Sequence, residues 1–358
     1  MIPRKFMERV REYWESFRVG SWFLGTGSAV LVLLVIGLLS CYVAPRSWAL
    51  TSFVSDRLPF PLATVGASPA ASFRSVAEDL ASVRRFYESQ DFSSVGLRVD
   101  FTTEDGKKRL MVREREIINR AIENEAIRRI ARREGIAISD DEVEKAVSDQ
   151  LNTEGNDVQD VERRLKTLYG WNISEFTGKV VKPALYEEEL RKRFESDTSR
   201  FSDARAKAEN AEKRLRDGRD FADVAEEFSD GRTSRDGGDM GWFSYDDLDV
   251  SLRDAAGNQA VGKPGDVVES GLGFHILLVK DRKAESGKDL VQLAQIFVPK
   301  QTFGDWLADE MRMMPVRVLS PSYEWDRDAA RVEFRDRSMR EFEANLARNS
   351  EGDASVIF

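Results

Sequence analysis

An uncharged, apolar run near the start of the chain constrains its fold more than any other feature. No charged residue occurs from Val19 to Pro45, and residues 29–39 are almost entirely aliphatic. About 20 apolar residues in a helix span the roughly 30 Å hydrocarbon core of a bilayer, and a buried core helix seldom needs so long a run. Aromatic residues, which favour the headgroup region, flank it: Trp22, Phe23, Tyr42 and Trp48. The sequence therefore predicts a transmembrane helix at residues 21–44.

The charges before this run predict its orientation. Residues 1–20 form a basic N-terminus, with five lysines and arginines against three glutamates, and such a flank stays in the cytoplasm. We therefore expect a single-pass membrane protein whose later domains are extracytoplasmic. Residues 38–41, Leu-Leu-Ser-Cys, also resemble a bacterial lipobox, in which the segment is cleaved and Cys41 carries a lipid. Both alternatives tether the chain to the membrane.

Composition excludes several classes of function. The chain has 54 lysines and arginines against 63 aspartates and glutamates, a net charge of −9, which argues against nucleic-acid binding. A single cysteine excludes an intramolecular disulfide framework and a multi-cysteine metal site, and a single histidine excludes a two-histidine metal centre. We therefore expect neither a metal nor another cofactor.

After the apolar run, the sequence predicts a linker followed by a helical region. Residues 45–72 are rich in Pro, Ser and Ala, which is typical of a linker. Helical periodicity then predicts helices at residues 75–87, 107–134, 139–151, 158–169 and 173–194. A Ser-x-x-Glu capping box from Ser139 to Glu142 begins the third helix, and Pro183 predicts a kink or a boundary in the last. One buried stripe is expected on the longest helix: Ile118, Ile122, Ala126 and Ile130.

The order of these elements is similar to a known chaperone region. The long helix is followed by Gly-Ile-Ala-Ile-Ser-Asp-Asp-Glu-Val at residues 135–143, and Tyr-Gly-Trp-Asn-Ile-Ser-Glu-Phe at 169–176 opens a later helix. This order resembles the helical N-terminal region of the SurA, PpiD and PrsA class. We therefore expect residues 73–203 to form a helical chaperone domain.

The sharpest pattern lies between residues 204 and 280. A predicted helix at 204–216 is followed by Gly-Arg-Asp-Phe, Phe-Ser-Asp, Gly-Gly-Asp-Met-Gly-Trp-Phe, Gly-Lys-Pro-Gly-Asp-Val and Gly-Phe-His-Ile, in that order. The glycines allow positive-φ turns between helix and sheet. The apolar residues around His275 predict a strand covered on both faces, so its side chain should face inward. The block resembles the parvulin-type (PpiC, rotamase) peptidyl-prolyl isomerase domain.

This resemblance implies a fold and a site. The fold class is α+β: a parvulin-like domain at residues 204–300, with a four-stranded antiparallel sheet and surrounding helices. The late-strand histidine is His275, and a hydroxyl five residues earlier is Ser270. The apolar proline pocket falls on four residues: Met240, Phe243, Leu248 and Leu252.

Several positions depart from the family pattern. Gly231 stands where the family has Asp or Cys, Leu252 stands where it has an aromatic residue, and the stretch before His275 is shorter. The family's first strand is also missing before residue 204. We expect residues 290–298 to replace it from the C-terminal side, a circular permutation in which Gln295 takes the place of the family's first histidine. The alternative is that 290–298 form an added edge strand.

The sequence thus predicts a membrane-tethered, extracytoplasmic folding factor with a parvulin-type domain. The resemblance implies that the membrane is the bacterial inner membrane. Its partners would be unfolded or newly secreted polypeptides that contain proline. An alternative is a catalytically weak domain that serves as a holdase, a client-binding module or a module in contact with the secretion channel. Residues 301–358 form a C-terminal extension in which a short helix at 303–313, an extended segment at 315–319 and a final helix near 329–348 are expected, without chemistry of their own.

Overall fold

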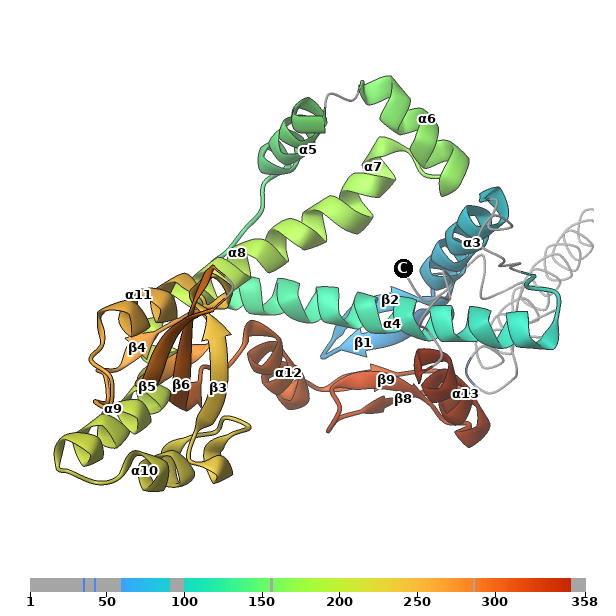
Figure 1. Cartoon of the computed structure of the whole chain (residues 1–358). Coiled ribbons are helices and arrows are strands. Elements are labelled where there is room, and N and C mark those ends of the chain that lie inside the picture. Colours follow the sequence, from blue (N-terminus) through green and yellow to red (C-terminus); the bar gives the residue numbers. More distant parts are fainter. Residues whose placement is uncertain are drawn as a thin grey trace, which may run out of the picture. The chain divides into compact units, whose positions relative to one another are not determined.

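The computed structural model describes residues 59–90, 100–154, 157–285 and 287–348, together with Val35 and Tyr42. The chain divides into two units (Figure 1). The helical unit comprises Met1–Leu190 and Ala308–Phe358, and the sheet unit comprises Arg191–Leu307. Among the described residues, no helix is both long and apolar enough to cross a bilayer. The predicted helix at 21–44 lies outside the described residues except for Val35 and Tyr42, and so does Cys41.

A long helix, α4 (Glu104–Arg133), organises the helical unit. The predicted stripe is buried: Ile118, Ile122, Ala126 and Ile130 have no exposed surface. Helix α3 (Phe73–Ser89) packs against it and is capped by reciprocal hydrogen bonds between Ser72 and Ser75. The other α-helices that lie wholly within this unit are α5 (Asp140–Glu154), α6 (Val158–Leu168), α7 (Ile173–Phe176) and α13 (Arg337–Arg348).

Two predicted local signals are confirmed. Before α5, the backbone N–H of Ser139 donates to the Glu142 carboxylate at 2.7 Å, and the N–H of Glu142 donates to the Ser139 hydroxyl at 3.2 Å. The predicted interruption near Pro183 is a π-helical turn at Thr177–Val181, after which α8 (Lys182–Ser196) begins. The backbone stays helical through this junction, so Pro183, which has no N–H to donate, lies where the hydrogen-bond pattern changes from π-helical to α-helical.

The N-terminal part of the helical unit differs from the expected linker. Residues 61–72 form a hairpin of β1 (Pro61–Val65) and β2 (Ser68–Ser72), and β1 pairs with β7 (Val316–Val318). Leu62, Ala63 and Val65 are buried. The prolines do not prevent this sheet, because Pro69 lies in the edge strand, where a missing N–H is tolerated. The prediction of a linker is therefore wrong for these residues.

The C-terminal extension also contains more sheet than expected. A hairpin of β8 (Tyr323–Asp326) and β9 (Arg331–Phe334) precedes α13, so the final helix begins at Arg337 and not near residue 329. Val332 and Phe334 alternate with polar residues and are buried. The side chain of Asn119 on α4 accepts the N–H of Val332 at 2.9 Å. Contact with α4, distant in sequence, therefore stabilises a strand where the composition suggested a helix.

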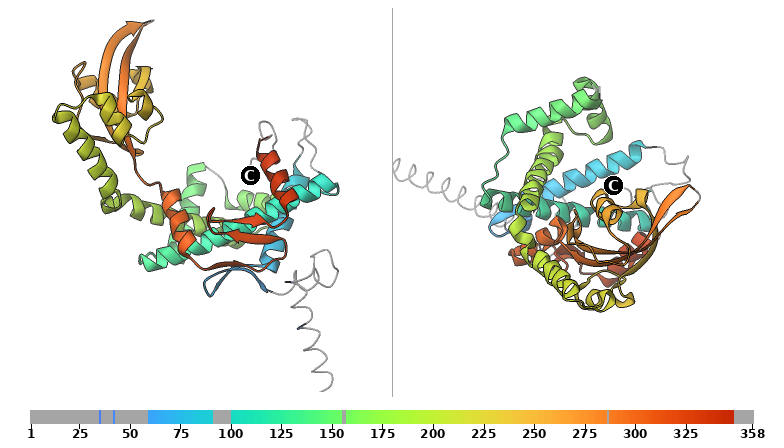
Figure 2. Two further views of the ribbon diagram at one scale, coloured as in Figure 1. Left: turned by 90° about the horizontal axis from the view of Figure 1, so that it is seen from below. Right: turned by 60° about the vertical axis from the view of Figure 1, so that its left-hand side comes forward.

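The sheet unit contains an antiparallel sheet in the order β3–β6–β5–β4 (Figure 1), which confirms the α+β expectation. Figure 2 shows the same unit, in yellow and orange, from two further sides. Its strands are β3 (Asp239–Ser244), β4 (Val268–Glu269), β5 (Gly273–Glu285) and β6 (Lys288–Pro299). Its helices are α9 (Ser202–Arg216), α10 (Phe221–Phe228) and α11 (Val250–Asn258), and α12 (Phe303–Met313) follows. Because β6 pairs with both β3 and β5, residues 290–298 form an interior strand, not an added edge strand.

The two faces of this sheet carry separate apolar cores. On one face, Ile276, Ala294 and Ile296 pack with buried residues of α9 and α10. On the other, Leu277, Val279, Val291 and Leu293 pack with Leu248 and with Ala256 of α11. Successive side chains of a strand point to opposite faces, so β5 and β6 contribute to both cores. This two-sided covering explains why the first half of β5, from Phe274 to Val279, is apolar at every position except His275.

Candidate functional site

His275 lies in the middle of the sheet unit, as the sequence predicted. It faces the same side of β5 as Leu277, and only 4% of its surface is exposed. In the register of the sheet, it stands opposite Phe297 of β6 and Val268 of β4. The rings of His275 and Phe297 lie 4.8 Å apart. The imidazole is therefore held between neighbouring strands and away from solvent.

Both imidazole nitrogens are hydrogen-bonded. The Ser270 hydroxyl lies 2.7 Å from His275 Nε2, and Gln295 Nε2 lies 2.7 Å from His275 Nδ1. When the Gln295 amide donates to Nδ1, Nε2 carries the proton and donates to Ser270 Oγ. That oxygen also accepts the N–H of Leu272 at 3.1 Å. The three polar residues predicted from the sequence thus form one continuous hydrogen-bonded chain.

This environment keeps His275 uncharged. Burial lowers its pKa from the ordinary 6.5 to about 4, an effect that nearby Asp249 opposes and Lys300 reinforces. Lys300 also donates to the carbonyl of Ser270 at 3.0 Å and to the Glu269 carboxylate at 2.6 Å. Neutral pH therefore leaves an imidazole with one N–H and one lone pair, each already matched to a partner.

The predicted pocket residues gather on the same face of the sheet as His275. Leu248 is buried, and Met240, Phe243 and Leu252 are partly buried against the core that contains Leu277. These side chains come from β3, from α11 and from the turn between them. The structure therefore brings together all four residues expected in the proline pocket, in one apolar cluster on the sheet face that also carries His275.

Steric constraints explain the second glycine of the Gly-Gly-Asp motif. Gly238 has φ +77°, and a Cβ there would lie 2.5 Å from the carbonyl oxygen of Gln295. The N–H of Gln295 donates to the Gly238 carbonyl at 2.9 Å. No other residue allows β3 to approach β6 this closely with a positive φ. The motif thus fixes the backbone of the residue that holds His275 Nδ1.

Gly231 lies close to the polar chain, but it contributes no side chain. The N–H of the preceding Asp230 donates to the Phe297 carbonyl at 2.8 Å, and Ser229 Oγ accepts the N–H of Phe297 at 3.0 Å. A Cβ on Gly231 would lie 3.6 Å from the Cβ of Phe297 and 3.2 Å from Ser229 Oγ. A side chain would therefore fit beside Phe297 after a small shift of one hydroxyl.

Sequence reasoning missed two residues near His275. Phe297 is two positions after Gln295 in a strand, and this spacing alone places both on one face. Asp249 caps α11 by accepting the backbone N–H of Ser251 at 2.9 Å. Its carboxylate also accepts the Ser251 hydroxyl, and these two hydrogen bonds, that of the hydroxyl above all, lower the pKa of Asp249. From the sequence, Asp249 could be recognised only as an N-cap residue of a helix. That pattern does not show that the helix begins close to His275.

Comparisons with known proteins agree with this geometry. Residues 186–283 match the family model described as "PPIC-type PPIASE domain". The chain is 32% identical over 119 residues to the chaperone SurA of Idiomarina loihiensis, covering 32% of this chain and 28% of that protein. It is 26% identical over 235 residues to SurA of Alkalilimnicola ehrlichii, covering 63% and 52%, respectively.

The chain is also similar to foldase proteins named PrsA. The chain is 40% identical over 77 residues to the foldase protein PrsA of Halalkalibacterium halodurans, covering 21% of this chain and 23% of that protein. In these comparisons the chain spans between about a quarter and about half of its relatives' length. The chain therefore carries a PPIC-type, that is a parvulin-type, peptidyl-prolyl isomerase domain and is similar to the chaperone SurA and the foldase PrsA.

Proposed function

We propose that the protein is a membrane-anchored, extracytoplasmic folding factor that binds unfolded or newly exported polypeptides and isomerises their prolyl bonds at His275. One observation carries the catalytic part of this proposal: a buried, uncharged imidazole with both nitrogens hydrogen-bonded borders an apolar surface. The curated relatives named SurA and PrsA support the folding role. The uncharged run at 21–44 supports the anchor.

The chemistry requires no strong acid or nucleophile. Amide resonance gives the prolyl bond a rotational barrier of about 18–20 kcal/mol. Met240, Phe243 and Leu252 would hold the proline ring in a place poor in water, where the twisted amide loses less solvation than in solution. The chain of Ser270, His275 and Gln295 would supply fixed dipoles at the edge of this surface, where the carbonyl rotates. A neutral imidazole suits this role, because a buried cation would require its own counter-ion.

The strand order supports the proposed circular permutation. The family match ends at residue 283, before β6 begins at Lys288. Yet β6 occupies the interior of the sheet and supplies Gln295 to the site. An interior strand outside the family match supports the prediction that residues 290–298 replace the family's first strand. We propose that this chain completes the parvulin sheet from its C-terminal side.

A second candidate function is a domain that binds proline segments but turns them over slowly. Gly231 favours this candidate, since the family's polar group is missing beside Phe297 although the space for a side chain exists. Leu252 favours it as well, because it places an aliphatic side chain where the family has an aromatic ring. This candidate includes a holdase and a module in contact with the secretion channel.

The test is prolyl exchange measured by NMR on an Ala-Pro peptide with the full-length chain in detergent micelles. This measurement detects binding and turnover separately. If the domain is an active isomerase, the protein accelerates cis–trans exchange of the peptide, and His275→Ala abolishes this acceleration. The control variant Lys263→Ala, at an exposed position outside the site, should keep it. Line broadening without accelerated exchange would establish the second candidate. Peptide signals that do not change at all would refute both.

A further inference from the structure

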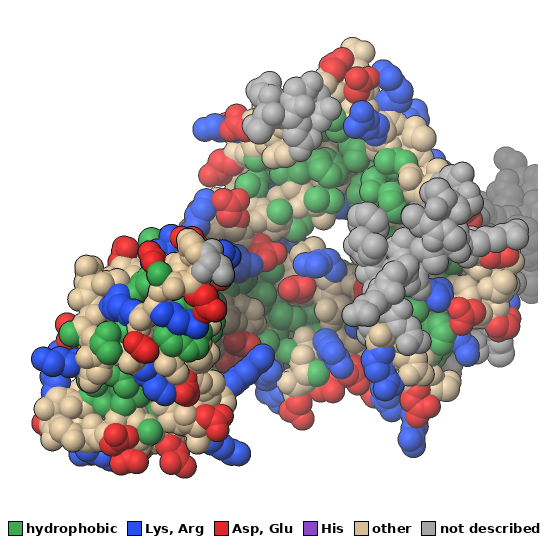
Figure 3. All heavy atoms as spheres, viewed as in Figure 1, with side chains coloured by type: hydrophobic (Ala, Val, Ile, Leu, Met, Phe, Trp, Pro, Cys, Tyr) green, Lys and Arg blue, Asp and Glu red, His purple; other side chains and the backbone are tan. Residues whose placement is uncertain are grey.

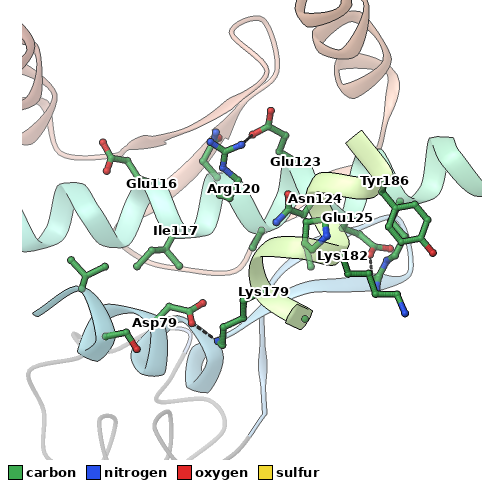
Figure 4. A pocket seen from close by; sticks show the side chains of 18 of the residues that line it. Asp79, Glu116, Ile117, Arg120, Glu123, Asn124, Glu125, Lys179, Lys182 and Tyr186 are labelled. Carbon is green, nitrogen blue, oxygen red and sulfur yellow. Dashed lines mark hydrogen bonds and ion pairs between the residues drawn. The ribbon is translucent and has the colours of Figure 1, made fainter. Parts of the chain in front are cut away.

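A pocket of about 1000 Å³ lies within the helical unit, between α3, α4 and the segment from α7 to α8 (Figure 4). One face of α4 forms one side of it. Asp79 of α3, Trp171 before α7 and Lys179 of the π-helical turn form other sides. This volume is at the upper end of the range for small-molecule sites, and π-helical turns are frequent at functional sites. No part of the proposed isomerase site lines it.

The charges of this pocket do not balance. Four acidic side chains line it, and each is paired with a cation that also lines it: Asp79 with Lys179, Glu116 with Arg113, Glu123 with Arg120, and Glu125 with Arg128. Three more cations line the pocket: Arg115, Arg132 and Lys182. The lining therefore has a net charge of +3 (seven cations minus four acids), although the whole chain has a net charge of −9.

Two of the three excess cations are available to a ligand. Arg115 is held by Glu343 at 2.7 Å. Arg132 is exposed and makes no ion pair with any residue that the structure describes. Lys182 pairs at 2.9 Å with Asp140, whose side chain is 97% exposed, and a surface pair of this kind contributes little. On the visible face of the molecule, by contrast, acidic and basic side chains are interspersed (Figure 3).

Two other features match a polypeptide and not a small anion. Asn124 is partly buried on α4 between the ion pairs (Figure 4), and its amide has no hydrogen-bond partner among the described residues. An amide offers both donors and an acceptor, as an extended backbone requires. Trp171 stacks on Tyr169 at 5.0 Å and donates to the Ser82 hydroxyl at 2.8 Å. Lys179 Nζ lies over the same ring, 5.8 Å from its centroid, so Trp171 is a fixed aromatic side chain that offers its remaining edge to an apolar side chain.

We propose that this pocket binds a short, extended, acidic segment of another polypeptide. Carboxylates of the segment would meet Lys182 and Arg132, its backbone would bond to Asn124, and an apolar side chain would pack against Trp171. This interaction is independent of prolyl isomerisation. It gives the helical unit a preference for acidic segments that the family resemblance does not supply.

The test is fluorescence anisotropy with the full-length chain in detergent at low salt. One probe is a fluorescein-labelled octapeptide with three glutamates and two leucines, and the other replaces each glutamate by glutamine. We expect the glutamate probe to bind at least about tenfold more tightly, which corresponds to about 1.4 kcal/mol. The double change Lys182→Glu and Arg132→Glu should remove this difference. Lys145→Glu is the matched control: it is exposed on α5, outside the pocket, and should leave both affinities within about twofold.

Asn124→Ala should weaken both probes equally, since it removes a bond to backbone. Several results would overturn the proposal: equal affinity of the two probes, no binding of either, or an equal loss in the control variant. Tighter binding after deletion of residues 349–358, which include Glu351 and Asp353, would show that the chain's own tail is the occupant. Prolyl exchange measured on the same samples separates these outcomes from a failure of the isomerase proposal.

Discussion

The only histidine of the chain should make the stability of the sheet unit depend on pH. His275 has a pKa of about 4 in the fold, against an ordinary value of 6.5. The folded state therefore binds fewer protons than the unfolded state between these values, and stability rises with pH across this window. The contribution is complete above pH 6.5 and is lost progressively as the pH falls toward 4.

The magnitude follows from the size of the pKa difference. One pKa unit corresponds to 1.36 kcal/mol, so a fall from 6.5 to about 4 gives a full contribution of at most about 3.4 kcal/mol. Lowering the pH from 7 to 5 should remove about 2 kcal/mol of it, a large part of a typical stability of about 5–15 kcal/mol. Burial also raises the pKa of two carboxyls, Glu123 and Glu343, but both lie in the helical unit. Raised carboxyl pKa values lower stability as pH rises, so they act in the opposite direction.

The assay is urea unfolding of the full-length chain in detergent, followed by circular dichroism and by the NMR signal of ¹³C-labelled histidine. A single histidine gives one signal, which reports both the folded fraction of the sheet unit and the midpoint of its titration. His275→Gln cannot titrate, so its stability should no longer fall between pH 7 and pH 5. A histidine signal that titrates near 6.5 in the folded protein would refute the reasoning. So would a variant that keeps the pH dependence of the parent.

Three further predictions follow from the site and the anchor. Gly231→Asp combined with Leu252→Phe should raise prolyl exchange by at least about tenfold if the frame of the site is sound; unchanged exchange in a folded double variant would contradict this. Gly238→Ala should destabilise the sheet unit by about 2 kcal/mol or more, because the new Cβ would clash with the backbone of β6 and because φ is positive there. The control is Gly271→Ala, which should leave the urea midpoint unchanged, since no atom lies within 4 Å of its Cβ. A phosphatase fused after Asp281 should be active only if exported; activity confined to the cytoplasm would exclude the predicted orientation.

Much of the fold followed from local signals in the sequence. Helix boundaries near Ser139 and Pro183 could be predicted, since a capping box and a missing N–H act within a few residues. The motifs around Gly238 and His275 predicted a positive-φ turn and an inward-facing histidine, and both are present. The stripe on α4 was equally clear, because its helical period depends only on spacing along the chain.

Tertiary structure decided what depends on partners distant in sequence. The composition of residues 61–72 predicted a linker, because prolines interrupt their short apolar pattern. These residues form a sheet only through pairing with β7, which is distant in sequence. The strand β9 exists because α4 covers it, which no local propensity can encode. The pocket along α4 is lined by residues that lie between Ala70 and Tyr186 in the sequence, so only the packing of distant segments forms it.

The site itself shows the same division. The sequence alone determined the residue types, with one histidine, one serine five positions before it and a glutamine in a later strand. Only the sheet decided that both nitrogens of His275 would be bonded, because the order β3–β6–β5–β4 places Gln295 beside the ring. Hydrogen bonds across strands depend on register and on strand order, and the chain acquires these when its distant segments pack.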